Sequence, residues 1–186
     1  MKGAAHYPAF LRLDGKRVLL VGGGAVAARK ARALARCGAR VKVVAPRVGP
    51  SARRAARSVV ERSFQSRDLE GVALAVCATD DERLNERVSR LCRSRGIWAN
   101  VVDRPRLCDF IVPAVVRRGP LSIAFSSGGA SPFMARRLRR RLQTLLTPED
   151  ARLAAELGKL RPRLLEMSLP RRRRVLAGIA AARGLS

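Results

Sequence analysis

The chain has 186 residues and carries 39 Lys and Arg against 14 Asp and Glu, a formal net charge of +25, with 47% hydrophobic residues. That length can bury a real core and suits one globular domain, or one domain with appendages. No apolar run reaches the roughly 18–20 residues that cross a bilayer, and the N-terminus lacks a signal peptide's hydrophobic stretch, so we expect a cytoplasmic protein without membrane contact.

The positive charge is densest toward the C-terminus. Residues 113–186 hold 16 basic and 4 acidic side chains, whereas residues 1–112 hold 23 and 10. Such a field attracts polyanions, which include nucleic acid, anionic lipid and a polycarboxylate substrate. Solvated arginine-rich helix faces account for the individual arginines equally well.

The four cysteines and the single histidine do not form a metal-binding pattern. Cys37, Cys77, Cys92 and Cys108 lie far apart in the sequence without a C-x-x-C pair, and His6 lies near a terminus. This spacing predicts buried thiols rather than a zinc or iron–sulfur site, and it offers no protein metal ligands.

The first predicted element is a buried strand over residues 16–21, which runs into a glycine-rich turn and a helix over residues 25–36. The spacing Gly22-x-Gly24-x-x-Ala27 fits the dinucleotide fingerprint G-x-G-x-x-G/A. Gly22 allows the tight turn, Gly24 lets the backbone approach a pyrophosphate, and Ala27 lets the helix pack on the strand. The N–H groups that begin the helix then face the phosphates.

Strands and helices alternate as far as residue 112. A capping box formed by Thr79 and Glu82 is expected to open the helix that ends near Gly96. The alternation predicts an α/β fold, a Rossmann-like parallel sheet with helices on both faces. The other expected elements are strands at 40–44, 59–62, 71–78 and 97–102 and a helix at 51–58.

The pattern changes from Phe110 onward. Two strands within residues 110–126 are joined by a turn at Gly119, and a second glycine-rich loop follows. Ser131 and Pro132 then supply the N-cap and first position of a helix that reaches about residue 146. Further helices begin near Thr147 and Leu169. The sequence therefore divides into residues 1–112, 113–146 and 147–186.

Five motifs occur in order along the chain. They are Tyr-Pro-Ala-Phe-Leu at 7–11, the loop at 21–27 with Arg-Lys-Ala at 29–31, Ala-Thr-Asp-Asp at 78–81, Asn-Val-Val-Asp at 100–103 and Ser-Ser-Gly-Gly-Ala-Ser-Pro at 126–132. Together they resemble precorrin-2 dehydrogenase, the module that also forms the N-terminal part of bifunctional sirohaem synthases. The resemblance spans nearly the whole chain and is densest between residues 7 and 142.

The resemblance implies an oxidoreductase that uses NAD to oxidise precorrin-2 to sirohydrochlorin in sirohaem, or tetrapyrrole, biosynthesis. It also implies an NAD-binding domain at 1–112, a dimerisation and substrate-binding segment at 113–146, a helical segment at 147–186, and a homodimer. The substrate's eight carboxylates suit a basic pocket. We expect a stand-alone dehydrogenase, because the chain leaves no room for a methyltransferase domain.

Two other functions remain open. Some members of the family also insert ferrous iron, so the chain could be a bifunctional dehydrogenase and ferrochelatase. A regulator that senses a nucleotide and binds nucleic acid through the arginine-rich tail is the other alternative, although no helix-turn-helix pattern is evident.

Asp103 is the residue that we expect to act as the catalytic base. It ends a parallel strand, where ligands bind in such sheets, and the resemblance points to the aspartate of the Asn-Val-Val-Asp motif. By position alone it could simply cap the turn before Pro105. The expected cofactor-binding residues are Gly22, Gly24, Ala25, Val26, Pro46, Arg47, Thr79 and Asp80, although a helix-capping role is sufficient for the last two.

The second glycine-rich loop is the expected substrate-binding segment. It lies just before a helix N-terminus, which is a ready site for a substrate carboxylate, and a plain tight turn is the alternative. Its residues are Ser126, Ser127, Gly128 and Gly129.

The position after the second strand departs from the classical NAD site. An acidic residue there normally holds the ribose hydroxyls, but this chain has Ala45, Pro46 and Arg47. Backbone contacts near Pro46 and Arg47 would serve instead. Arg47 could also favour a 2′-phosphate, which leaves NADP as an alternative to NAD.

Overall fold

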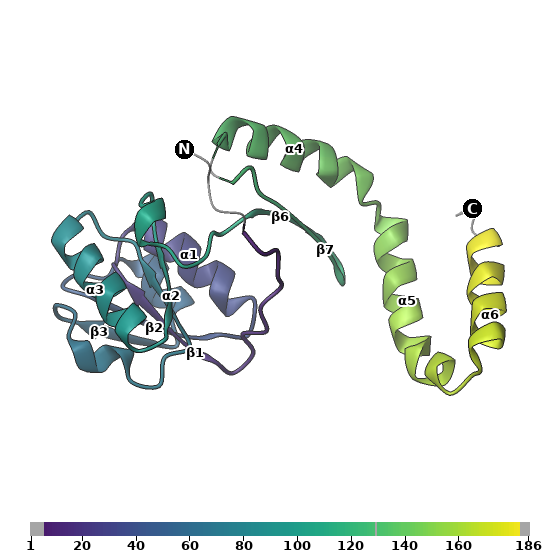
Figure 1. Cartoon of the computed structure of the whole chain (residues 1–186), viewed down its shortest axis with the longest axis horizontal. Helices are drawn as coiled ribbons and strands as arrows, with labels where there is room; N and C mark the ends of the chain where they lie inside the picture. Colours follow the sequence, from purple (N-terminus) through teal and green to yellow (C-terminus); the bar gives the residue numbers. More distant parts are fainter. Residues whose placement is uncertain (1–5, 129, 183–186) are drawn as a thin grey trace. The chain divides into compact units, whose positions relative to one another are not determined.

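The computed structural model describes residues 6–128 and 130–182, which fold into two compact units that divide between Val112 and Pro113 (Figure 1). No helix within these ranges combines the length and the apolarity needed to cross a bilayer.

The first unit is a parallel sheet with helices on both faces, which confirms the predicted Rossmann-like α/β fold. The strand order is β3-β2-β1-β4-β5, and every neighbouring pair is parallel. Helices α1 and α2 pack on one face and α3 on the other (Figure 1). The elements are β1 Arg17–Val21, α1 Ala25–Ala35, β2 Arg40–Ala45, α2 Pro50–Ala55, β3 Ser58–Glu61, η1 Ser66–Leu69, β4 Leu74–Cys77, α3 Glu82–Ser94, β5 Trp98–Val101 and η2 Pro105–Leu107.

Strand β1 lies at the centre of both halves of the core. Val18 and Leu20 pack on the face covered by α1 and α2, while Leu19 and Val21 pack on the face covered by α3. A strand that is covered on both faces is apolar at every position, because alternate side chains point to opposite faces. This explains why residues 18–21 form an unbroken apolar run.

The register aligns the carboxyl ends of the strands along one edge of the sheet. Val21 of β1 pairs with Val44 of β2 and with Cys77 of β4, and Cys77 in turn pairs with Val101 of β5. From β1 the chain first builds β2 and β3 on one side, and then returns to build β4 and β5 on the other. The order therefore reverses between β1 and β4, which is where ligands bind in open α/β sheets.

Helix α2 is shorter than the expected helix at 51–58. Ala56 adopts an extended conformation, and the backbone N–H of Arg57 donates to the carbonyl oxygen of Val41 at 2.8 Å. The chain thus pairs with β2 as soon as the helix ends, and β3 begins at Ser58 rather than at residue 59.

Beyond residue 112, the described residues form a β-hairpin followed by helices (Figure 1). Ser131 caps α4 by accepting from the Met134 N–H at 3.2 Å, and Thr147 forms a capping box with Asp150 at the start of α5, so both predicted helix starts are confirmed. The elements are β6 Ala114–Arg118, β7 Leu121–Phe125, α4 Pro132–Leu145, α5 Pro148–Leu165 and α6 Leu169–Ala181.

Asp68 on η1 is a fully buried carboxylate that ties β2 to the segment after β3. Both guanidinium Nη atoms of Arg62 and the Nζ of Lys42 donate to it at 2.8 Å, and the N–H of Gln65 donates at 2.9 Å. The Arg62 hydrogen bonds, followed by those from Lys42 and Gln65, hold the pKa of Asp68 well below its ordinary value, although burial opposes them. Removing one partner from a buried pair leaves the remaining charges uncompensated.

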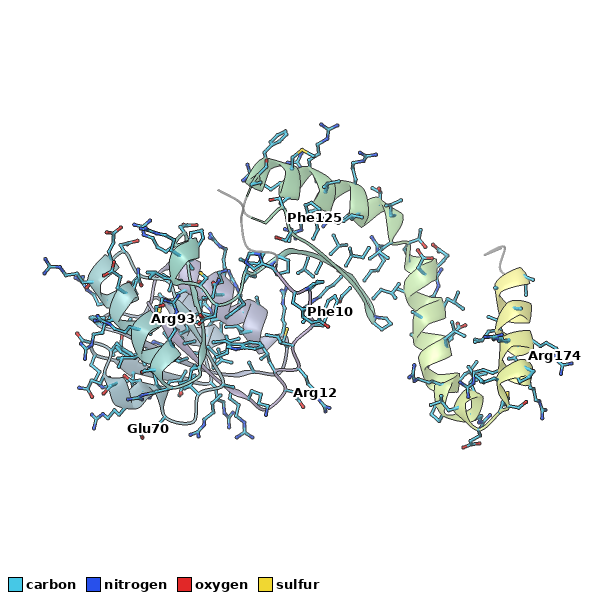
Figure 2. The ribbon with its side chains drawn as sticks, in the orientation of Figure 1. Phe10, Arg12, Glu70, Arg93, Phe125 and Arg174 are labelled. Atoms are coloured by element: carbon cyan, nitrogen blue, oxygen red, sulfur yellow. The ribbon has the colours of Figure 1, made fainter. Side chains whose placement is uncertain are left out.

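We expect Asp68→Asn to lower the free energy of unfolding at neutral pH by about 3 kcal/mol. Because the pKa of Asp68 is depressed in the folded state, its contribution to stability is present above the unfolded-state pKa of about 4 and fades as the pH falls below that value. Urea unfolding at neutral and acidic pH measures both effects. Glu70→Gln is the control, since Glu70 is an exposed carboxylate two residues later, at the C-cap of η1 (Figure 2). Equal stability of the two variants at neutral pH would contradict the expectation.

Candidate functional site

The glycine run after β1 is shaped by two backbones that approach it closely. Gly22 has φ +123°, and a Cβ there would lie 2.2 Å from the carbonyl oxygen of Ala78, which follows β4. A Cβ on Gly23 would lie 2.0 Å from the carbonyl oxygen of Arg47, which follows β2. Gly22 thus lets the backbone after β1 contact the backbone after β4, and Gly23 lets it contact the backbone after β2. No role was predicted for Gly23 from the sequence, although the triple-glycine run was a signal for it.

Gly24 lies in a different environment, because a Cβ there would meet nothing within 4 Å. It is the N-cap of α1, in extended conformation, and makes no side-chain cap hydrogen bond. Ala27 is fully buried against the sheet, as the fingerprint predicts. The start of α1 therefore combines open space with the N–H groups and positive dipole end that bind a phosphate.

A cleft of about 310 Å³ opens beside this loop. It brings together Val26, Thr79, Asp80 and Asp103, four of the residues predicted from sequence for the cofactor and for catalysis. Its full lining is Val26, Ala78, Thr79, Asp80, Glu82, Asn85, Val102, Asp103 and Arg104. The predicted residues thus come from three segments, at the start of α1, after β4 and after β5.

The segment after β4 does not form the predicted capping box. Asp81 caps α3 by accepting from the Leu84 N–H at 3.0 Å. The Thr79 hydroxyl instead donates to Oδ1 of the buried Asn85 at 2.9 Å, and the Asn85 amide donates to the carbonyl oxygen of Thr79 at 3.0 Å. This reciprocal pair fixes the side of the cleft that Asn85 lines, a role that the sequence analysis did not assign.

Asp103 has φ +58° and is the one described residue other than glycine with positive φ. The left-handed region is sparsely populated by residues other than glycine, and Asp and Asn occupy it most readily. Its carboxyl group is exposed at the cleft. A second hollow of about 460 Å³, along η2, also includes Asp103, so this residue lies between two cavities.

The loop that carries Asp103 is anchored by side chains that pair with β5. The Cys108 thiol accepts from the Val101 N–H at 3.2 Å and donates to the Val101 carbonyl oxygen at 3.1 Å. Asn100 donates to the carbonyl oxygen of Phe110 at 2.9 Å, and Asp109 accepts from the Ala99 N–H at 2.9 Å. These contacts hold the segment after Asp103 against the strand before it, so the unusual backbone at Asp103 is constrained from both sides.

Two charged groups near Asp103 were not predicted as site residues. Lys30 is half-buried on α1, one turn after Val26; burial lowers its pKa, and attraction to Asp103 opposes that shift. Arg104 forms an ion pair with Glu82 at the start of α3. The signal for Lys30 was its position four residues after Val26, which places both on one helix face.

Pro46 and Arg47 are exposed in the loop after β2. They do not line the cleft that contains Asp103. Their loop is held against the glycine run instead, because the Gly49 N–H donates to the carbonyl oxygen of Gly23 at 3.0 Å.

The predicted substrate loop belongs to the second unit. The Ser126 hydroxyl accepts from the Gly128 N–H at 3.0 Å, and the Ser127 hydroxyl accepts from the Ser131 N–H at 3.1 Å. Gly128 has φ +63°, which a turn requires here. Gly129 lies outside the described residues. Both hydroxyls thus stabilise the turn that precedes α4.

Gly24→Ala tests whether this loop binds a dinucleotide. The structure has room for the methyl group, so we expect stability to fall by no more than about 1 kcal/mol, the cost of Ala at an N-cap. The methyl group would nevertheless occupy the space through which a pyrophosphate approaches, so NAD binding measured by calorimetry should weaken at least about tenfold. Gly158→Ala, at another open position, is the control. Unchanged affinity in the Gly24 variant would contradict this use of the loop.

Two family models and several relatives match the chain. The family model described as "Putative NAD(P)-binding" matches residues 9–114, and the one described as "Sirohaem biosynthesis protein central" matches residues 118–145. A relative named "Siroheme synthase" from Pseudomonas paraeruginosa is 46% identical over 164 residues, which cover 86% of this chain and 35% of the relative. A relative of the same name from Azotobacter vinelandii is 44% identical over 176 residues, which cover 91% of this chain and 38% of the relative.

The chain thus spans about a third of the length of these relatives. Among solved structures, the precorrin-2 dehydrogenase SirC matches with a TM-score of 0.75 and 28% identity, over 94% of this chain and 89% of that one. The matches together cover both units. The chain belongs to the "Putative NAD(P)-binding" family, and it is similar to siroheme synthases and to the precorrin-2 dehydrogenase SirC.

Proposed function

We propose that this chain is an NAD-dependent precorrin-2 dehydrogenase that forms sirohydrochlorin in sirohaem biosynthesis. The reaction removes a hydride and a proton from the substrate, and NAD, when bound, accepts the hydride. The observation that carries the proposal is the position of Asp103, between the cleft beside the glycine loop and the hollow along η2. The likeness to SirC, a precorrin-2 dehydrogenase, supports it.

The residues around the cleft have distinct parts in this proposal. The backbone of Gly22, Gly24, Ala25 and Val26 binds the pyrophosphate at the start of α1. Pro46 and Arg47 flank the adenosine half of the cofactor. Thr79 and Asp80 line the cleft that receives the nicotinamide, where the Thr79–Asn85 pair keeps the wall in place.

Asp103 acts as the base that receives the substrate proton. Its exposed carboxylate can reach a substrate in either neighbouring cavity, and the anchored loop limits its movement. Lys30 attracts this carboxylate from α1 and helps to hold it at the cleft. A general base that is positioned in this way contributes about 10²–10⁴-fold to a rate.

The second unit supplies contacts to the substrate's carboxylates in this proposal. Ser126, Ser127, Gly128 and Gly129 precede the N-terminus of α4, whose dipole favours an anion. Residues 113–186 carry 16 basic side chains against 4 acidic ones, and arginines bind carboxylates through charge-assisted hydrogen bonds.

We also propose that the protein is a cytoplasmic homodimer assembled through residues 113–146. Large apolar side chains on α4 support an interface there, since Phe133 is 63% exposed and Leu145 is 67% exposed.

Sedimentation of the purified chain tests the proposed dimer. We expect a species of twice the chain mass, and a monomer at micromolar concentration would contradict the dimer.

Asp103→Asn is the sharpest test of the enzyme. Asn tolerates the left-handed backbone at this position, so the variant removes the base without adding the strain that Ala would introduce. We expect turnover of precorrin-2, followed by NADH absorbance, to fall at least about 100-fold while the Kd for NAD stays unchanged. Glu70→Gln, a change of an exposed carboxylate, should keep full activity. Full activity in the Asp103 variant would eliminate it as the base.

Iron insertion is a second candidate activity, because the relatives are named siroheme synthases. Here ferrous iron would be a substrate. The purified chain should be given sirohydrochlorin and ferrous iron without NAD, and formation of sirohaem above the rate without protein would support a bifunctional enzyme. Absence of the metallated product would leave dehydrogenation as the activity.

A further inference from the structure

The fingerprint of this chain lacks an acid at the end of β2, but the neighbouring strand has one. The residues after β2 begin with Pro46 and Arg47, neither of which can accept a hydrogen bond from a ribose hydroxyl through its side chain. Strand β3 runs parallel to β2, and its last residue, Glu61, pairs in register with Ala45. Glu61 therefore lies at the same carboxyl edge of the sheet, one strand further from β1.

The Glu61 carboxylate is directed to the loop that follows β2. Its Oε1 accepts from the Val48 N–H at 3.2 Å, and its Oε2 pairs with Nη2 of Arg53 on α2 at 2.7 Å. The Arg53 hydrogen bond, followed by that from Val48, lowers the pKa of Glu61 and keeps the group ionised at neutral pH. The acid is thus charged and oriented by two different elements.

The same carboxylate remains accessible to a ligand. The Glu61 side chain is 46% exposed. Each oxygen of an ionised carboxylate can accept about two hydrogen bonds, and Val48 and Arg53 use one on each oxygen. Acceptor capacity is therefore left beside the loop after β2, next to the strand end from which an acid normally holds the adenosine ribose.

We propose that Glu61 supplies from β3 the acid that holds the adenosine ribose, and that it makes the site select NAD over NADP. The inference rests on the proposed function, in which a dinucleotide binds with its pyrophosphate at the start of α1. A ribose 2′-hydroxyl donates to the carboxylate, whereas the 2′-phosphate of NADP is an anion and is repelled by it. Arg53 does not reverse this preference, because Glu61 already neutralises its charge.

The test is the ratio of the two dissociation constants, measured by calorimetry with the full chain and each dinucleotide alone. Wild type should bind NAD more tightly than NADP. Glu61→Gln should weaken NAD binding about tenfold, the worth of one hydrogen bond to a charged group, while NADP binding stays equal or improves. The control Glu70→Gln should change neither constant. If Glu61 only holds the loop, both constants weaken by the same factor, and that outcome would overturn the proposal.

Two further variants keep the inference testable if Glu61→Gln does not fold. Arg53→Met removes the charge that partly neutralises Glu61, so discrimination against NADP should increase. An unchanged ratio of the NADP and NAD dissociation constants would contradict the proposed role of Glu61. Arg47→Met tests the alternative that Arg47 binds the 2′-phosphate of NADP. In that case the wild type would prefer NADP, and the variant would lose that preference. If the wild type binds neither dinucleotide, the proposed function itself is contradicted. If Glu61→Gln changes the dissociation constants of NAD and NADP by the same factor, only the role of Glu61 is contradicted.

Discussion

The close contact between the turn after β1 and the segment after β4 is the constraint on which the site depends. At Gly22 the two backbones approach so closely that no side chain fits, and the backbone also adopts a positive φ. This contact lies where the strand order reverses, so it brings the start of α1 next to the residues that follow β4 and β5. The cleft that contains Val26, Thr79 and Asp103 is also lined by Ala78, the residue that Gly22 approaches.

The site is also stiffened by polar contacts that do not take part in the proposed chemistry. Cys108 and Asn100 hold the loop after β5, and the Thr79–Asn85 pair holds the loop after β4. Such contacts keep Asp103 in a backbone region that is rarely occupied without support. The exposed carboxylate is thereby presented on a fixed frame, which is what a base requires when it must meet a substrate in one orientation.

The sheet could be predicted, and the candidate site residues could be proposed, because their signals are local. The apolar run of β1, the spacing from Gly22 to Ala27 and the place of Asp103 after a strand are all visible in short segments. Glu61 could not be assigned in this way, since it acts on the Val48 N–H, which the pairing of β2 with β3 brings near, and the close approach of Arg47 to Gly23 likewise appears only in the fold. The capping prediction at Thr79 failed within a local segment, because the Thr79 hydroxyl bonds to Asn85 six residues later and Asp81 is better spaced to cap α3.

A crystal structure of the chain with bound NAD would show whether the cofactor binds at this site. We expect the pyrophosphate to lie over the N–H groups that begin α1 and the nicotinamide ring to lie in the cleft beside Asp103. Electron density for the dinucleotide at another surface, with the start of α1 and the cleft both without cofactor, would contradict this expectation.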